Sequence, residues 1–195
     1  MRIPSLAFLC FALVCAALGM EAAAADLGPV AYAPPAASMS FLSEIRGGVL
    51  THNPAARESG SVDVSLELLT VKPFTSADPL VNIFIPRLHL GTSINTGGYT
   101  SQVYAGFTWN YHITEKLFFE ASFGGAVHNG KTGEFVPRDR ASLGCSPLFR
   151  ESASLGYRFD RNWSIMATIE HVSNAKLCND NQGLTSYGVR IGYAF

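Results

Sequence analysis

Hydrophobic and polar residues alternate along most of the chain from residue 41 onward. Successive side chains of a β-strand point to opposite faces, so a period of two predicts strands with one apolar face and one polar or small face. The segments are each about ten residues long, which suits a strand that crosses a membrane at a tilt. The eight predicted strands cover residues 41–52, 61–72, 82–94, 100–112, 116–128, 148–159, 162–174 and 184–195. The predicted fold is all-β, an eight-stranded antiparallel transmembrane β-barrel.

The last predicted strand shows the pattern well: Tyr187 and Val189 share one face, and Gly188 and Arg190 share the other. A bilayer requires every backbone polar group to be paired, which a closed barrel achieves. The third predicted strand is the weakest, because Pro86 cannot donate a ladder hydrogen bond. Charged residues fall mostly on the polar faces, where acids and bases are expected to pair and fill a narrow interior. They are Glu44, Arg46, Asp63, Glu67, Arg87, His89, Glu120, Arg158, Glu170 and Arg190.

The first 25 residues have the features of a secretory signal peptide: a basic start at Arg2, an apolar run over Leu6–Leu18 and small residues up to Ala25. We expect cleavage after Ala25, since the apolar run is too short for a spanning helix. The predicted organisation is a signal peptide over 1–25, a flexible periplasmic segment over 26–40 and an outer-membrane barrel over 41–195.

Two of the four cysteines, Cys10 and Cys15, fall inside the signal peptide and would leave with it. Cys145 and Cys178 remain. In an oxidising compartment, a lone pair of cysteines most simply forms one disulfide. This bridge would hold the long loop before residue 148 against the hairpin of the last two strands.

Composition narrows the class of protein further. The chain is 48% hydrophobic and 15% charged, with a formal net charge of −1, so nothing indicates nucleic-acid binding. The histidines and cysteines lack ligand-like spacing, and no phosphate-binding glycine loop occurs, so we expect no metal and no cofactor. A soluble β-sandwich has a similar alternation and stays an alternative to the barrel.

Loop lengths predict the orientation of the barrel. Connections at Ile113–Glu115 and Asp160–Arg161 are tight, whereas Asn129–Pro147 and Ala175–Gly183 are long. Long loops face outside in bacterial outer-membrane barrels, so the strand over 162–174 runs outward and both ends of the barrel chain lie in the periplasm. An interfacial aromatic girdle is expected at the periplasmic level. Its predicted members are Trp109, Tyr111, Phe159, Trp163, Tyr193 and Phe195.

His171 and Ser173 stand on the apolar face of the outward-running strand, near its outer end. An imidazole can take the proton of a serine hydroxyl and make it a nucleophile. The spacing of two residues puts both side chains on one face, about 6–7 Å apart at Cβ. Polar groups directed at lipid cost free energy, so this position favours a function. The alternative is that the strand leaves the membrane here and both residues meet lipid head groups.

The runs EHVSNA at 170–175, NQG at 181–183 and GVRIGYAF at 188–195 resemble the PagL-type acyloxyacyl hydrolases, which are outer-membrane lipid A 3-O-deacylases. The resemblance is specific over these last residues and architectural before them. It implies an eight-stranded barrel with a serine-hydrolase site that faces the membrane. The expected substrate is the ester-linked acyl chain at the 3 position of lipid A, in lipopolysaccharide of the outer leaflet.

By this resemblance His171 would be the general base and Ser173 the nucleophile. Asn174, with neighbouring backbone amides, would stabilise the oxyanion, and Asn181 would support the hairpin. The family pattern places an acid, usually Glu, at the position of Thr185. Thr185 can accept a hydrogen bond from the imidazole but brings no charge.

Loss of a triad acid lowers turnover by about four orders of magnitude in other systems, so the missing acid matters for function. Asp180 in the adjoining loop is the predicted substitute, because Glu170 should face the lumen. A second function class is a catalytically weak or inactive barrel with a structural, adhesion or lipopolysaccharide-binding role. A third, a small channel, is disfavoured because side chains fill the interior of eight-stranded barrels. The sequence does not indicate an oligomeric state or an acyl-chain preference.

Overall fold

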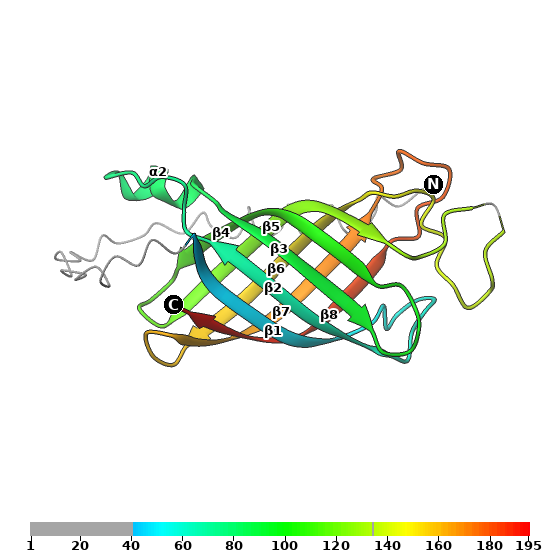
Figure 1. Ribbon diagram of the computed structural model, residues 1–195, viewed down its shortest axis with the longest axis horizontal. Helices are drawn as coiled ribbons and strands as arrows, with labels where there is room; N and C mark the ends of the chain where they lie inside the picture. The colour runs from blue at the N-terminus through cyan, green and yellow to red at the C-terminus, as the bar shows by residue number, and fades with distance from the viewer. Residues whose placement is uncertain (1–40, 134) are drawn as a thin grey trace, which may run out of the picture. The chain divides into compact units, whose positions relative to one another are not determined.

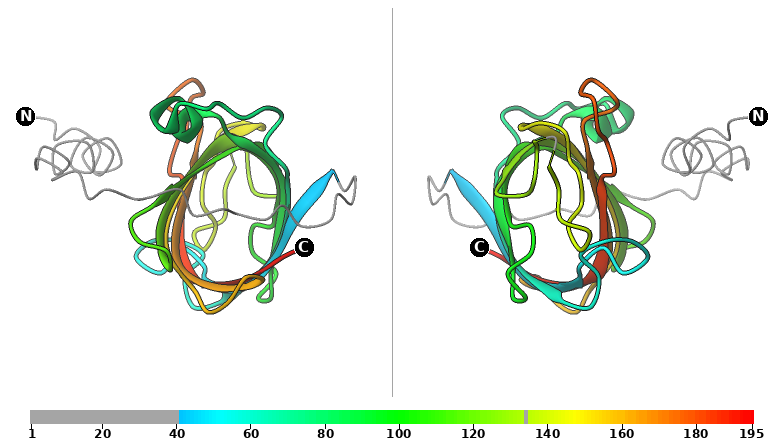
Figure 2. Two further views of the ribbon diagram at one scale, coloured as in Figure 1. Left: turned by 90° about the vertical axis from the view of Figure 1, so that its left-hand side faces the viewer. Right: turned by 90° about the vertical axis from the view of Figure 1, so that its right-hand side faces the viewer.

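The computed structural model describes residues 41–133 and 135–195, which form a closed antiparallel β-barrel (Figures 1 and 2). Each strand pairs with the next, and β1 pairs with β8 to close the sheet. The predicted signal peptide over 1–25 and the segment over 26–40 lie outside the described residues. The strands are β1 (Leu42–Thr51), β2 (Val62–Thr70), β3 (Arg87–Asn95), β4 (Gln102–His112), β5 (Leu117–His128), β6 (Leu148–Arg158), β7 (Trp163–Ser173) and β8 (Leu184–Ala194).

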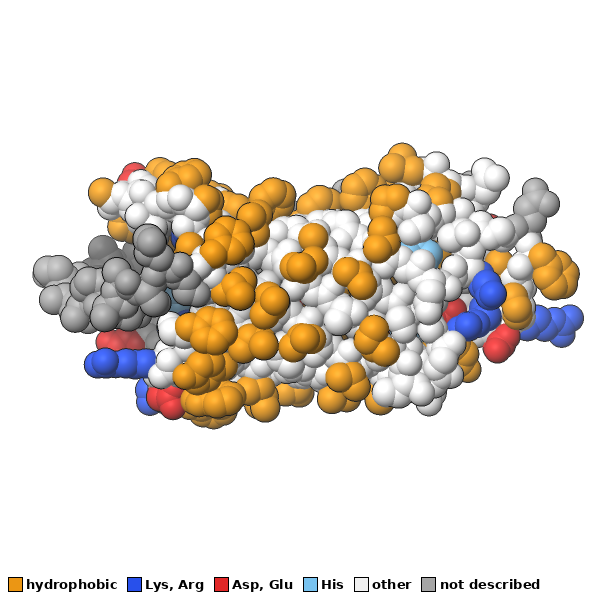
Figure 3. Space-filling view, viewed as in Figure 1, with side chains coloured by type: hydrophobic (Ala, Val, Ile, Leu, Met, Phe, Trp, Pro, Cys, Tyr) orange, Lys and Arg blue, Asp and Glu red, His pale blue; other side chains and the backbone are white. Residues whose placement is uncertain are grey.

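The barrel wall follows the alternation of the sequence. Along β7, Ser164, Met166 and Thr168 are buried, whereas Ala167 and Ile169 are exposed. Figure 3 shows hydrophobic side chains spread over the wall and charged ones gathered toward the two ends. An apolar outer band of this kind matches the hydrocarbon layer of a bilayer. In the described part of the chain, no helix is long and apolar enough to cross a membrane.

Paired charges fill the interior, as the sequence predicts. The Arg46 guanidinium contacts Glu44 at 2.8 Å and also reaches two further glutamates, Glu67 and Glu120. Glu170 is 2% exposed, and its Oε2 lies 2.7 Å from a guanidinium nitrogen of both Arg150 and Arg190. Buried charges are stable only when paired in this way, so these residues serve as the core of the barrel.

The third predicted strand, over 82–94, begins too early. Residues Pro79–Phe84 form a short helix, α2, and β3 begins only at Arg87. Asp78 caps the helix, because its Oδ1 accepts hydrogen bonds from two first-turn amides at 2.8 and 3.4 Å, and a proline in the first turn suits a helix start. The prediction of strand over 82–86 is therefore wrong. The other seven predicted strands end within two residues of the observed bounds.

The two ends of the barrel differ (Figure 1). At one end lie the longer loops after β1, β3, β5 and β7. At the other end lie two tight turns, the C-terminus of β8 and the connection that carries α2. Aromatic rings meet at the tight-turn end, where Tyr193 lies 4.9 Å from Trp163 and 5.8 Å from Phe195, ring centroid to ring centroid. These three rings belong to the predicted aromatic girdle, and they lie at the end with the tight turns.

Candidate active site

His171 and Ser173 are the last two outward-facing residues of β7, at the end of the barrel that carries the long loops. Both side chains are half-buried, whereas Ile169 one step below is exposed. β7 therefore holds an imidazole and a hydroxyl on its lipid-facing side at the rim of the apolar band.

The imidazole of His171 is held from β8. Its Nδ1 lies 2.8 Å from Oγ1 of Thr185, the residue paired with it across the β7–β8 ladder. A hydrogen on Nδ1 donated to Thr185 leaves Nε2 with the lone pair that a general base needs. The predicted contact between Thr185 and the imidazole is thus present in the structure.

Gly183 makes room for the other side of the ring. Its backbone has a φ of 63°, and a Cβ added there would lie 3.2 Å from His171 Nε2. Continuing the β7–β8 register places Gly183 level with Ser173, so the Cε1–Nε2 edge of the ring faces the level of the serine. Within the described residues no hydrogen bond joins the Ser173 hydroxyl to His171. Catalytic hydrogen bonds of this kind often tighten only when substrate is bound.

The side chain of Asn174 connects two loops through hydrogen bonds. It is 2% exposed, and its Nδ2 donates to the carbonyl oxygens of Leu143 and Asp180 at 2.8 and 2.5 Å. Its backbone N–H donates to Asn181 Oδ1 at 2.9 Å, which agrees with the supporting role expected of Asn181. Both Nδ2 hydrogens are in use, so an oxyanion would have to compete with two backbone carbonyls for this amide.

The structure does not bring the predicted substitute acid to the imidazole. The Asp180 carboxylate accepts a hydrogen bond from Ser142 Oγ at 2.8 Å and so ties the β7–β8 loop to the β5–β6 loop. Glu170 points into the barrel, as predicted, and is occupied by Arg150 and Arg190. Among the described residues, neither acid forms a hydrogen bond or an ion pair with the imidazole of His171, which contacts Thr185 instead.

A different acid, Glu151, stands beside His171. Glu151 lies on β6 and pairs directly with His171 across the β6–β7 ladder. It shares the outward face of β6 with Phe149 and Leu155, both exposed. The side chains of Glu151 and His171 are both half-buried and lie on the outward face of the wall, so an acid stands at the position next to the imidazole. Sequence reasoning missed Glu151, although a lone acid on the apolar face of a predicted membrane strand is a signal that could have found it.

A disulfide joins Cys145 to Cys178, with their Cα atoms 6.1 Å apart. The predicted bridge is confirmed, and it ties the β5–β6 loop to the β7–β8 loop beside the site. No group of three or more His, Cys, Asp or Glu side chains in the described part of the chain is arranged to hold a metal ion.

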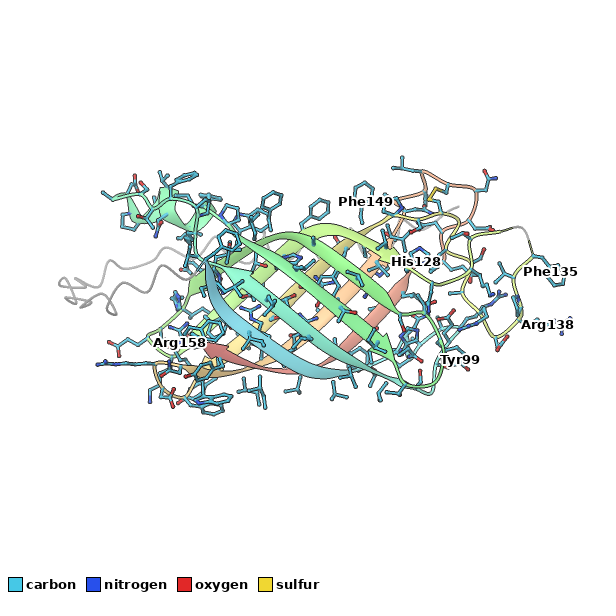
Figure 4. The ribbon with its side chains drawn as sticks, viewed as in Figure 1. Tyr99, His128, Phe135, Arg138, Phe149 and Arg158 are labelled. Atoms are coloured by element: carbon cyan, nitrogen blue, oxygen red, sulfur yellow. A yellow bond between two sulfur atoms is a disulfide. The ribbon has the colours of Figure 1, made fainter. Side chains whose placement is uncertain are left out.

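A groove of about 350 Å³ lies on the outside of the barrel next to Ser173. Phe149 in its lining pairs with Ser173 on one side and with Gly125 on the other, and Figure 4 shows Phe149 at the long-loop end. Its lining is almost entirely apolar and consists of Phe123, Gly124, Gly125, Cys145, Pro147, Leu148, Phe149, Asn174 and Leu177. A larger cavity of about 470 Å³ is lined by interior charges and by Arg158, at the opposite end from His171.

Comparisons with known proteins bear on the fold and the family of the chain. A family model described as lipid A 3-O-deacylase (PagL) matches residues 70–194. The crystal structure of the outer membrane enzyme PagL superimposes with a TM-score of 0.60 at 19% identity, covering 77% of this chain and 98% of that chain. A de novo designed transmembrane β-barrel superimposes with a TM-score of 0.51 at 14% identity, covering 80% of this chain and 96% of that one.

None of the curated proteins compared with the chain matches it. At these identities the two structural likenesses show the fold alone. The family model spans more than half of the chain, and the chain therefore belongs to the PagL family of lipid A 3-O-deacylases.

Proposed function

We propose that this protein is an outer-membrane serine ester hydrolase that removes the 3-O-linked acyl chain from lipid A. The observation that carries the proposal is the placement of His171, which is held through Nδ1 by Thr185 and directs Nε2 toward the level of Ser173. Family membership supports lipid A as the substrate. The predicted signal peptide and the apolar wall support an outer-membrane location.

In the reaction, His171 Nε2 accepts the proton of Ser173 as Oγ attacks the ester carbonyl carbon. The tetrahedral intermediate collapses by breaking the bond to the 3-oxygen of the glucosamine, which leaves as a hydroxyl after taking the proton from the imidazolium. Ser173 then carries the acyl group as an ester. A water molecule gives a proton to His171 as its oxygen attacks that ester. The bond between the acyl carbon and Ser173 Oγ then breaks, Oγ takes the proton back from the imidazolium, and the fatty acid leaves.

The position of the groove supports an acyl ester as substrate. Its apolar lining begins beside Ser173, so a fatty chain can lie along β5 and β6 while the ester reaches the hydroxyl. The groove opens on the membrane side of the barrel, at the rim predicted to face the outer leaflet. A lipid confined to that leaflet would enter sideways without leaving the membrane.

Thr185 favours a second candidate function, a family barrel that binds lipopolysaccharide without turning it over. Thr185 fixes the ring of His171 but carries no negative charge to stabilise the imidazolium formed during catalysis. Removal of that charge from a Ser-His-Asp triad lowers turnover by about 10⁴-fold.

Mass spectrometry of lipid A separates the two functions. Refolded protein is incubated with lipopolysaccharide beside Ser173→Ala and beside Ser59→Ala, a control that removes an exposed hydroxyl from another outer loop. Loss of one 3-hydroxyacyl chain with the parent and the control, but not with Ser173→Ala, is the expected result. Equal deacylation by Ser173→Ala would show that Ser173 is not the nucleophile. No deacylation by the parent would favour the binding function.

A further inference from the structure

The site gives His171 two neighbours of different chemistry, one on each adjoining strand. Thr185 on β8 offers a hydroxyl at 2.8 Å from Nδ1, and Glu151 on β6 offers a carboxylate at the directly paired position. Cross-strand partners have Cβ atoms about 4.5–5.5 Å apart, so a glutamate side chain can reach the ring of its partner.

Glu151 has no other evident task. It faces outward, where an unpaired charge is unfavourable away from the membrane surface. Among the described residues, no Arg or Lys forms an ion pair with it, whereas the interior glutamates Glu67 and Glu170 are each surrounded by arginines. The imidazole of His171, at the paired position on β7, becomes positive when it accepts the serine proton, and Glu151 can stabilise that charge.

We propose that the two tasks of a triad acid are divided here, with Thr185 orienting the imidazole and Glu151 supplying the negative charge that stabilises its protonated form. The inference rests on the proposed function and names the charge that replaces the acid missing at residue 185. Glu151 acts through His171 as a positioning residue and does not touch the ester.

Relocating the charge tests the proposal. The variants are Glu151→Gln, Thr185→Glu, the double variant with both changes, and Glu115→Gln, which removes a glutamate from a tight turn at the opposite end. We expect Glu151→Gln to lower kcat by at least about 10²-fold with little change in KM, since general-base catalysis contributes about 10²–10⁴-fold. The double variant should recover most of that loss, because the carboxylate returns to the imidazole from β8. Glu115→Gln should match the parent.

A second measurement does not depend on lipid A. A fluorophosphonate probe labels an activated serine, and intact mass reports its attachment to Ser173. Glu151→Gln should slow labelling, and the double variant should restore it. Far-UV circular dichroism of each variant confirms that the barrel has folded.

The outcomes separate the two proposals. If the parent is labelled at Ser173 but leaves lipid A intact, the proposed substrate is wrong, and the labelling rates still decide the role of Glu151. If Glu151→Gln keeps the parental kcat and labelling rate, the role of Glu151 is refuted and the deacylase stands. If the parent is inactive in both assays, Glu151 does not replace the missing charge, whether or not Thr185→Glu gains activity.

Discussion

Replacing Glu58 by Gln is expected to loosen three outer loops while the barrel stays folded. Glu58 lies in the loop after β1 and is 2% exposed. Its Oε1 accepts a hydrogen bond from the Ala141 amide at 3.0 Å, and its Oε2 accepts one from the Thr100 amide at 2.9 Å. The same Oε2 lies 3.1 Å from His52 Nε2. One carboxylate thus connects the loops that follow β1, β3 and β5.

The size of the expected stability loss follows from the pKa shifts of Glu58 and His52. Burial favours the neutral Glu58 carboxyl, but hydrogen bonds from His52 and from the Thr100 and Ala141 amides outweigh it and lower its pKa from 4.5 to about 2. Burial also disfavours charged His52, but hydrogen bonds to Asp63 and Glu58 outweigh it and raise its pKa from 6.5 to about 9. Each shift corresponds to about 3 kcal/mol, and because the two groups share one contact the values do not add.

The directions of the two pKa shifts define the pH range in which the loops are stabilised. The contribution of Glu58 is present above pH 4.5 and is lost as the pH falls toward about 2. The contribution of His52 is present below pH 6.5 and is lost as the pH rises through about 9. The three loops should therefore be most stable between pH 4.5 and pH 6.5, where both contributions are present. They should loosen at lower pH and at higher pH.

Hydrogen exchange of the Thr100 and Ala141 amides, corrected for intrinsic rates, measures this local stability. At about pH 6, Glu58→Gln should lower protection of both amides by about 10²-fold, the equivalent of about 3 kcal/mol. Amides within β4 and β5 should keep their protection, and Glu115→Gln should behave as the parent. Unchanged protection at both amides would refute the role of Glu58, and equal loss in the strands would show that the barrel itself had weakened.

Three further predictions concern the site. Gly125→Leu should narrow the groove and shift deacylation toward shorter acyl chains, as seen by mass spectrometry of released fatty acids, whereas Gly47→Leu, at another open outward position, should not. Gly183→Ala should lower kcat by about 10²-fold in a lipid A assay, because a Cβ there has an unfavourable positive φ and crowds the imidazole. Joint replacement of Cys145 and Cys178 by Ser releases a link across 33 residues, worth about 3–4 kcal/mol by loop entropy, and should speed tryptic cleavage of the β5–β6 loop without unfolding the strands.

Alternation predicted the strands because each wall residue faces either lipid or a packed interior, and a one-residue error would reverse every side chain of a strand. The failure at residues 82–86 has a local cause. Asp78 and Pro79 form a helix-start signature, and the short apolar run behind them is ambiguous between helix and strand. The capping hydrogen bonds of Asp78 therefore favour a helix at this point, although the apolar pattern is also compatible with a strand.

The site was predictable only where it depends on parity within one strand. The outward faces of His171 and Ser173 follow from alternation along β7, and the outward face of Thr185 follows from alternation along β8. Glu151 depends on the register between β6 and β7, which is fixed by their tight turn, where Asp160 Oδ1 accepts hydrogen bonds from two backbone amides at 2.8 Å each. Asp180 lies in an irregular loop whose course no period encodes, so its contact with Ser142 could not be anticipated.

The packed interior explains why chemistry would be confined to the outer rim. Inside the barrel, arginines form ion pairs with Glu67, Glu120 and Glu170. Removing one partner of a buried ion pair typically lowers the stability of the fold by about 3–5 kcal/mol. These acids are therefore not free to exchange protons. On the outer face, an Arg or Lys costs about 2–4 kcal/mol at the bilayer midplane but about 0–1 kcal/mol near the interface, and an Asp or Glu costs less. At the end of β7, His171 and Glu151 stand where a charge costs less than deeper in the wall, beside an apolar groove. Under the proposed function, this depth suits an ester at the boundary between head group and acyl chain.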